Sequence, residues 1–129
     1  MIKTVECLLL ILFMLGFAAC GGKEEPVSYE QISAKQAKEL MQSEKEYIII
    51  DARTEEEYAA GHIEGAILIP EYEIARRAEN ELPDKDVLIL VYCRSGRRSK
   101  IASEALVKLG YTNVKEFGGI IDWPYETVQ

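Results

Sequence analysis

The feature that most constrains this chain is the stretch from Val87 to Ser99, where an apolar run is followed at once by a polar loop. The run VLILVY has six apolar residues, half of its length β-branched, and this predicts a strand that is buried on both faces. From Ser99 to Leu109 the apolar residues recur at helical spacing, and Gly110 follows as a stop. The sequence therefore predicts a buried strand, a tight loop and a helix.

The loop concentrates a thiol, guanidinium groups, hydroxyls and a glycine in seven residues, namely Cys93, Arg94, Ser95, Gly96, Arg97, Arg98 and Ser99. A loop that leads into a helix N-terminus directs unpaired backbone N–H groups toward its own centre, which favours an anion there. Gly96 permits the torsions that such a curled loop needs. A thiol in these surroundings has a pKa below its usual value of about 8.5. We therefore expect Cys93 to be a sulfur nucleophile and residues 94–99 to hold an anionic substrate. The alternative is a buried structural cysteine followed by a solvated basic turn.

The composition limits the partners and cofactors of the chain. Its 129 residues are enough for one domain, and its net charge of −7 argues against nucleic acid as the main partner. The sequence has one histidine and three cysteines that lie far apart, so no set of residues has the spacing of a metal site. We expect a monomer with no metal and no cofactor.

The N-terminal segment predicts export. Residues 1–19 contain Lys3 near the start, an apolar run and a small-residue end, which is the layout of a signal peptide. The next residue, Cys20, completes a segment similar to a bacterial lipobox, in which the cysteine is lipidated. Residues 20–28 then form the lipidated cysteine and a flexible tether, and residues 29–129 form the domain. We expect a lipoprotein anchored in the bacterial cell envelope, on its periplasmic or extracytoplasmic side. The alternatives are an uncleaved signal anchor or an ordinary secreted protein.

This interpretation accounts for every cysteine. Cys7 leaves with the signal peptide and Cys20 is linked to lipid, so Cys93 is the only free thiol that remains. A single leftover cysteine in an exported protein points to reactivity or to pairing with another chain.

Hydrophobic spacing and helix caps divide the rest of the chain into short elements. Capping boxes at residues 33–36 and 54–57 each begin a helix. We expect helices at 34–43, from 54 to a stop at 61, and at 72–81, strands at 47–50, 66–69 and 113–117, and a closing turn at 120–123. We also expect Gly118-Gly119 to break the last strand. Apolar strands that alternate with helices predict a parallel sheet of about four or five strands, covered on both faces.

In such sheets the functional site lies beyond the carboxyl ends of the strands. Asp51 and Arg53 follow one predicted strand, and Cys93 follows another. We therefore expect these side chains at the same edge of the sheet.

Four segments, in this order, resemble a single-domain rhodanese: DARTEEEY (51–58), GHIEGAILIP (61–70), CRSGRRS (93–99) and FGGIIDW (117–123). The resemblance covers about residues 29 to 123. It implies a compact three-layer α/β domain with a central parallel sheet flanked by helices. It also implies transfer of sulfane sulfur through a persulfide on the cysteine.

The chemistry implied by this resemblance fits the loop. Cys93 would take the outer sulfur of thiosulfate, release sulfite, and pass the sulfur to cyanide or a thiol. The backbone of residues 94–99 would stabilise the charged sulfur, and the arginines would attract the dianion. Asp51, Arg53 and His62 are expected to support the structure rather than to react.

Two other functions remain open at this level. Cysteine-dependent phosphatases and arsenate reductases also place a cysteine in an anion-binding loop, but the phosphatases have five residues between the cysteine and the arginine that binds phosphate. Here four residues separate Cys93 from Arg98, which favours a smaller site. The second alternative is a persulfide carrier or redox-sensing module that serves a partner protein.

Overall fold

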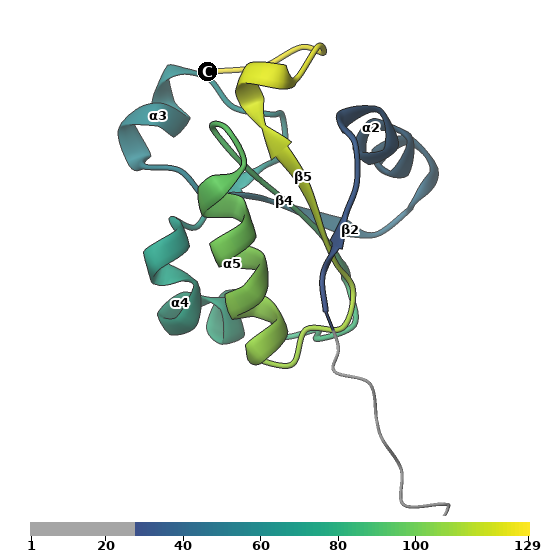
Figure 1. The fold of residues 1–129 in the computed structure, drawn as a ribbon, viewed down its shortest axis with the longest axis vertical. Coiled ribbons are helices and arrows are strands. Elements are labelled where there is room, and N and C mark those ends of the chain that lie inside the picture. The colour runs from purple at the N-terminus through teal and green to yellow at the C-terminus, as the bar shows by residue number, and fades with distance from the viewer. Residues whose placement is uncertain (1–27) are drawn as a thin grey trace, which may run out of the picture.

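The computed structural model describes residues 28–129, which form one five-stranded sheet. Its strands are β1 (Glu30–Gln31), β2 (Tyr47–Asp51), β3 (Ile67–Leu68), β4 (Leu88–Cys93) and β5 (Val114–Gly119). The order across the sheet is β1-β5-β4-β2-β3, and every neighbouring pair is parallel. The predicted parallel sheet is confirmed, and β4 lies at its centre (Figure 1).

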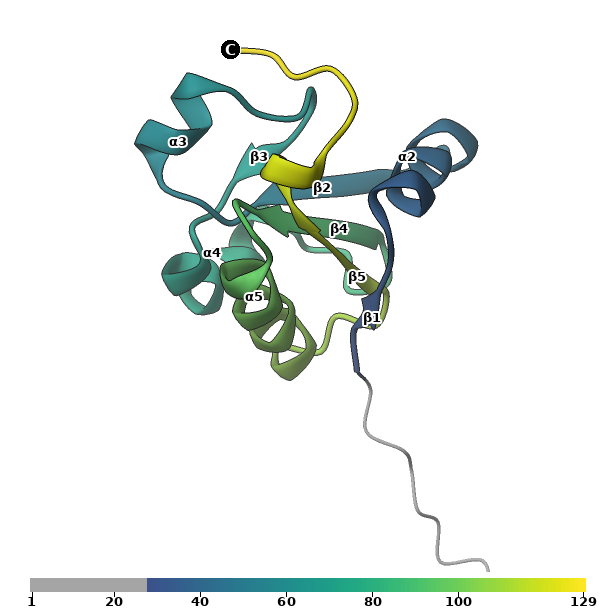
Figure 2. The ribbon, with the colours of Figure 1, turned by 45° about the horizontal axis from the view of Figure 1, so that its top comes forward.

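Helices cover both faces of this sheet. They are α2 (Ala34–Ser43), α3 (Glu55–Ala60), α4 (Ile74–Glu81) and α5 (Arg97–Lys108), with short 3₁₀ turns at Glu71–Glu73 and Ile120–Asp122. Figures 1 and 2 show α4 and α5 together on one side of the sheet and α2 on the other. The three-layer α/β architecture expected from the sequence is therefore confirmed.

The central strand β4 is buried along its whole length, as its composition predicts. Its side chains alternate between two cores. Ile89, Val91 and Cys93 join the core beneath α4 and α5, whereas Leu90 and Tyr92 join the core that includes Ala37 of α2, Phe117 and Trp123. Cys93 therefore belongs to the face that α5 covers.

Both predicted capping boxes are present, at Ser33 with Gln36 and at Thr54 with Glu57. Helix α2 has the predicted bounds, and α5 begins two residues earlier than expected, at Arg97. The short strand β1 was not predicted, because two residues carry no periodic signal.

The expectation that Gly118-Gly119 breaks the last strand is wrong. Strand β5 runs through both glycines, and Gly119 pairs with Cys93 across an irregular register after Val91. Gly119 has no side chain where the strand passes the loop after β4, so β5 can continue alongside β4 instead of ending.

The predicted signal peptide, Cys20 and most of the tether lie outside the described residues. Across residues 28–129, no helix has the length and apolar character needed to cross a membrane.

Candidate active site

The structure places Cys93 at the end of β4, at the bottom of a short loop that leads into α5. The residue is only 1% exposed. Gly96 adopts a positive φ of 108°, which a residue with a side chain rarely adopts, and this turns its backbone N–H toward the sulfur. The Gly96 N–H donates a hydrogen bond to Cys93 Sγ at 3.0 Å. The loop thus curls around the sulfur as the sequence suggested.

Ser99 provides the second contact to the sulfur. It lies in the first turn of α5, is fully buried, and its Oγ is 3.3 Å from Cys93 Sγ. The pKa of the Cys93 thiol lies below its ordinary value. Burial opposes ionisation, but hydrogen bonds from the Ser99 side chain and from the backbone N–H groups of Ser99, Gly96 and Ser95 outweigh it. A buried sulfur is thereby prepared to carry negative charge.

Behind Ser99 lies a buried carboxylate, Glu116 of β5, which is 3% exposed. The Ser99 hydroxyl donates to Glu116 Oε2 at 2.6 Å, and the Gly118 N–H donates to the same oxygen at 2.7 Å. A continuous hydrogen-bonded chain therefore runs from the sulfur of Cys93 through Ser99 to Glu116.

Gly119 sets how closely β5 approaches the loop. A Cβ atom at this position would lie 1.9 Å from the carbonyl oxygen of Arg94 and 2.5 Å from Cα of Ser95. The N–H of Ile121 also donates to that Arg94 oxygen, at 3.3 Å. The outer side of the loop is therefore supported by the backbone of β5 and the turn after it.

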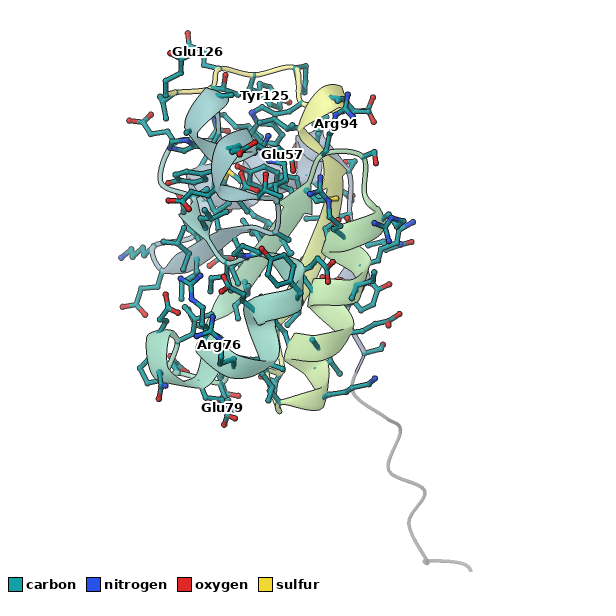
Figure 3. All side chains as sticks on the ribbon, turned by 90° about the vertical axis from the view of Figure 1, so that its left-hand side faces the viewer. Glu57, Arg76, Glu79, Arg94, Tyr125 and Glu126 are labelled. Atoms are coloured by element: carbon teal, nitrogen blue, oxygen red, sulfur yellow. The ribbon has the colours of Figure 1, made fainter. Side chains whose placement is uncertain are left out.

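The arginines of the loop fall into two groups. Arg94 and Arg97 are exposed and form no ion pair within residues 28–129. Arg98 instead forms a bidentate ion pair with Glu57 of α3, at 2.6 and 2.9 Å. Figure 3 shows Arg94 and Glu57 at the same end of the molecule, opposite Arg76 and Glu79. The loop therefore carries two exposed arginines, Arg94 and Arg97, that form no ion pair within residues 28–129, and one arginine, Arg98, whose charge is paired with Glu57.

The Arg98 ion pair changes the titration of its partner. The hydrogen bonds from Arg98 are the largest cause that lowers the pKa of Glu57 from its ordinary 4.5 to about 2, against partial burial that raises it. Glu57 is therefore charged at neutral pH and holds Arg98 toward α3.

Asp51 and Arg53 lie at the end of the neighbouring strand, β2. Arg53 Nη2 is 2.7 Å from Asp51 Oδ2 and 2.7 Å from the carbonyl oxygen of Gly61, and both side chains are buried. The Tyr92 hydroxyl also donates to Asp51 at 2.6 Å. Because Tyr92 directly precedes Cys93, this pair lies next to β4, and no hydrogen bond joins it to the sulfur within residues 28–129.

His62 is occupied by contacts away from the loop. Its Nδ1 lies 2.8 Å from the carbonyl oxygen of Tyr58, and the two rings are stacked with centroids 3.7 Å apart. The backbone of His62 pairs with Val128 near the C-terminus. These contacts join the end of α3 to the last residues of the chain.

The structure adds site residues that the sequence argument did not assign. The sequence predicts Glu57 only as part of a helix cap and places Glu116 only within the last strand. The segment FGGIIDW marked the glycines, but it gave no indication that one of them touches the loop. Among residues 28–129, no group of three or more histidine, cysteine or acidic side chains is placed to hold a metal ion.

The fold and this cysteine loop define a known class, and comparison with known proteins identifies it. Residues 33–124 match the family described as the rhodanese-like domain. This chain belongs to the rhodanese-like family.

Particular relatives make the class more specific. The chain is 44% identical over 73 residues to the thiosulfate sulfurtransferase PspE of Escherichia coli, which covers 57% of this chain and 70% of that protein. It is 35% identical over 94 residues to a sulfurtransferase of Allochromatium vinosum, covering 72% and 86% of the two chains. A solved structure titled "rhodanese with anions from E. coli" has a TM-score of 0.61 and 40% identity, covering 64% of this chain and 98% of that one. The protein is a rhodanese-like sulfurtransferase.

The chain spans a smaller share of longer relatives, 56% of one from Bacillus subtilis and 23% of one from Candida albicans.

Proposed function

We propose that this protein transfers the outer sulfur of thiosulfate, or of a related anionic donor, to a thiol or cyanide through a persulfide on Cys93. The observation that carries the proposal is the hydrogen bonding of a buried Cys93 sulfur by Gly96 N–H and Ser99 Oγ. The similarity to PspE, which is named a thiosulfate sulfurtransferase, supports thiosulfate as the donor.

The first half-reaction needs a nucleophile and a good leaving group. The Cys93 thiolate attacks the outer sulfur of thiosulfate, so that a new S–S bond forms as the bond between the two sulfurs of the donor breaks. Sulfite leaves with the electron pair of that bond and needs no proton at neutral pH. The negative charge then lies on the outer sulfur of the persulfide, where loop N–H groups can stabilise it.

The second half-reaction regenerates the Cys93 thiolate. The acceptor, as thiolate or cyanide, attacks the outer sulfur, and Cys93 leaves with the electron pair of the S–S bond. Hydrogen bonds lower the pKa of Cys93. They therefore favour the thiolate that attacks in the first half-reaction, and they also make Cys93 a better leaving group in the second.

The loop arginines favour a small sulfur anion over a phosphate ester. A cysteine-dependent phosphatase needs an arginine that grips the phosphate oxygens in a bidentate manner. Arg98 is the nearest candidate by sequence, but its guanidinium group is already occupied by Glu57. Exposed Arg94 and Arg97 instead provide long-range attraction for a dianion at the mouth of the loop.

A thiosulfate and cyanide assay tests the proposal directly. The wild-type protein is expected to form thiocyanate, and Cys93→Ser is expected to reduce the rate by at least about 10³-fold because the nucleophile is lost. An isolated wild-type protein incubated with thiosulfate alone should gain one sulfur atom on Cys93, measured by intact mass. A persulfide that forms only after addition of a second protein would favour the carrier function instead.

We also propose that the N-terminal segment anchors this activity in the bacterial cell envelope, with residues 1–19 removed and Cys20 lipidated. The support is the sequence pattern of residues 1–28. Intact mass of the protein extracted from membranes is expected to show loss of the first 19 residues and addition of lipid. An unprocessed N-terminus would contradict this localisation.

A further inference from the structure

Glu116 is a buried acid that the sulfur-transfer steps described above do not use. It is 3% exposed, and it forms no ion pair with a lysine or arginine among residues 28–129. Its Oε2 receives two hydrogen bonds, from Ser99 and from the backbone of Gly118. A buried carboxylate without a cationic partner is costly, so its position beside the reactive loop calls for a physical explanation.

Ser99 lies between two groups that can each carry negative charge. Its Oγ is 3.3 Å from Cys93 Sγ and 2.6 Å from Glu116 Oε2, and it also approaches the Gly96 carbonyl oxygen at 3.0 Å. A serine hydroxyl has one hydrogen to donate. It can therefore stabilise a carboxylate or a thiolate at any moment, but it cannot stabilise both.

We propose that Cys93 and Glu116 share one proton through Ser99, so that Glu116 takes up the proton that Cys93 releases. In one state the Cys93 thiol donates to Ser99, and Ser99 donates to the Glu116 carboxylate. In the other state the thiol proton has moved to Ser99 and the Ser99 proton to Glu116, which leaves a thiolate and a neutral carboxyl. No proton or charge leaves the three residues.

This inference rests on the proposed function for its role in catalysis. When an acceptor removes the outer sulfur, Cys93 leaves as a thiolate and receives the Ser99 hydrogen bond while Glu116 holds the extra proton. Glu116 acts through Ser99 and does not contact the donor or the acceptor. It is therefore a positioning residue for the reaction.

Other charged groups face this chain from each packed element. Arg98 of α5 senses the charge of Cys93 and is paired with Glu57 of α3, and Tyr29 before β1 senses the charge of Glu116. The loop also carries Arg94 and Arg97, and the Asp51–Arg53 ion pair lies at the end of the neighbouring strand β2, whereas Lys115, next to Glu116 on β5, is paired with Glu30. None of these groups bridges Ser99, so the variant at Glu116 isolates the shared proton.

The test is the pH dependence of Cys93 alkylation in the full chain. Iodoacetamide modification of Cys93 is followed by peptide mass spectrometry in wild type, Glu116→Gln and Glu104→Gln. Glutamine is neutral at every pH, so the Ser99 proton remains available to the sulfur. The midpoint of alkylation in Glu116→Gln is expected to fall by about one pH unit or more, the strength that defines coupled titration.

Glu104→Gln is the matched control, because it removes the same charge from an exposed position on α5. Its midpoint is expected to equal that of wild type. A purely structural role for Glu116 predicts the same midpoint in Glu116→Gln as in wild type, and that result would overturn the proposal, as would an increase.

A second measurement covers the case in which Glu116→Gln fails to fold. Infrared difference spectra of wild type, recorded as the pH rises through the Cys93 midpoint, should show the S–H band and a protonated-carboxyl band decreasing together, because both belong to the state that holds the shared proton. Loss of the S–H band with no loss of carboxyl signal would contradict the shared proton. Neither measurement uses a sulfur donor, so an absence of thiocyanate formation alongside the expected shifts would count against the proposed function alone.

Discussion

The carboxyl ends of β2 and β4 lie side by side in the sheet, but their last residues differ in whether an opposite charge balances them. Asp51 ends β2 with its charge fully met by Arg53 and the Tyr92 hydroxyl. Cys93 ends β4 with a sulfur that receives a hydrogen bond from Gly96 N–H, lies 3.3 Å from the Ser99 hydroxyl, and has no ion-pair partner among residues 28–129. Both residues are almost completely buried.

The difference separates support from reactivity. A buried ion pair with short hydrogen bonds fixes geometry, because breaking it would leave an uncompensated charge. Hydrogen bonds from a loop to a sulfur stabilise negative charge without neutralising it, so the sulfur still has an electron pair to donate. One strand end therefore holds the sheet edge in place, and the adjacent strand end carries the proposed nucleophile.

The strongest test of this comparison is Asp51→Asn. The substitution leaves the buried Arg53 guanidinium without its counter-charge, and it is expected to destabilise the fold by about 3–5 kcal/mol. Activity per folded molecule should fall by less than about tenfold, which corresponds to about 1.4 kcal/mol in the barrier. Urea unfolding and thiocyanate formation measure the two effects on the same sample.

Asp122→Asn is the control for Asp51→Asn, because Asp122 is exposed in the turn after β5. We expect a change in unfolding free energy within about 0.5 kcal/mol. If Asp51→Asn abolished activity but left stability intact, the assignment of this strand end to support would be wrong.

Gly119→Ala tests how β5 supports the loop that follows Cys93. The added methyl group would overlap the Arg94 carbonyl oxygen, so the loop or β5 must move. Overpacking of this kind costs about 1–3 kcal/mol, and we expect the displaced N–H groups to reduce the rate of thiocyanate formation by about 10- to 100-fold. The pH midpoint of Cys93 alkylation should rise, because hydrogen bonds to the thiolate lengthen.

Gly110→Ala separates loop displacement from general destabilisation. Gly110 has a φ of 98°, and no atom of residues 28–129 lies within 4 Å of an added Cβ, so alanine there strains the backbone without touching the loop. It is expected to cost about 1–2 kcal/mol and to leave the activity of the folded protein unchanged. Equal losses of activity in the two glycine variants would argue against a specific role for Gly119.

Arg98 and Arg94 of the loop differ in the same way, because one is held in an ion pair and the other is not. Arg94 is exposed and free of ion pairs within residues 28–129, whereas Arg98 is held by Glu57. We expect Arg94→Ala to raise the KM for thiosulfate severalfold at low salt, with the difference shrinking as salt screens the charge. Arg98→Ala should change KM by less and should lower the unfolding free energy by about 1 kcal/mol. Steady-state kinetics at two salt concentrations would refute this order if Arg98→Ala had the larger effect on KM.

The sequence predicted the strands and helices that are determined by residues close together in the chain. The six apolar residues before Cys93 define a buried strand, and the capping boxes before α2 and α3 set where those helices begin. These signals depend on neighbours within a few residues, so a single chain is enough to detect them.

The contacts that complete the site join residues far apart in the chain. Glu57 meets Arg98 across 41 positions, and Ser99 meets Glu116 across 17. The sequence around Glu57 is explained by its role in the helix cap, so it gives no indication of the ion pair with Arg98. Nothing near Glu116 in the sequence distinguishes it from a surface acid, because its burial is created only when β5 pairs with β4.

The Glu57–Arg98 pair gives the smallest effect, and its pH dependence has a defined sign. The pKa of Glu57 is about 2 in the folded protein against an ordinary 4.5. Because the folded value is the lower one, the pair stabilises the fold in full above about pH 4.5 and loses this contribution as the pH falls toward 2. Both side chains are partly exposed, 27% and 22%, so the contribution is expected to be about 1 kcal/mol.

Glu57→Gln isolates this contribution, because glutamine keeps the capping box of α3 while losing the charge. Urea unfolding is expected to show wild type more stable than Glu57→Gln at pH 6, with the two curves converging as the pH approaches 2. This result would show that a carboxylate holds Arg98 in place, as Asp51 holds Arg53, whereas Arg94 and Arg97 remain exposed. A difference that stays constant over this range would mean that Arg98 is not held by a charged Glu57, and the arginine would return to the group available to an anionic donor.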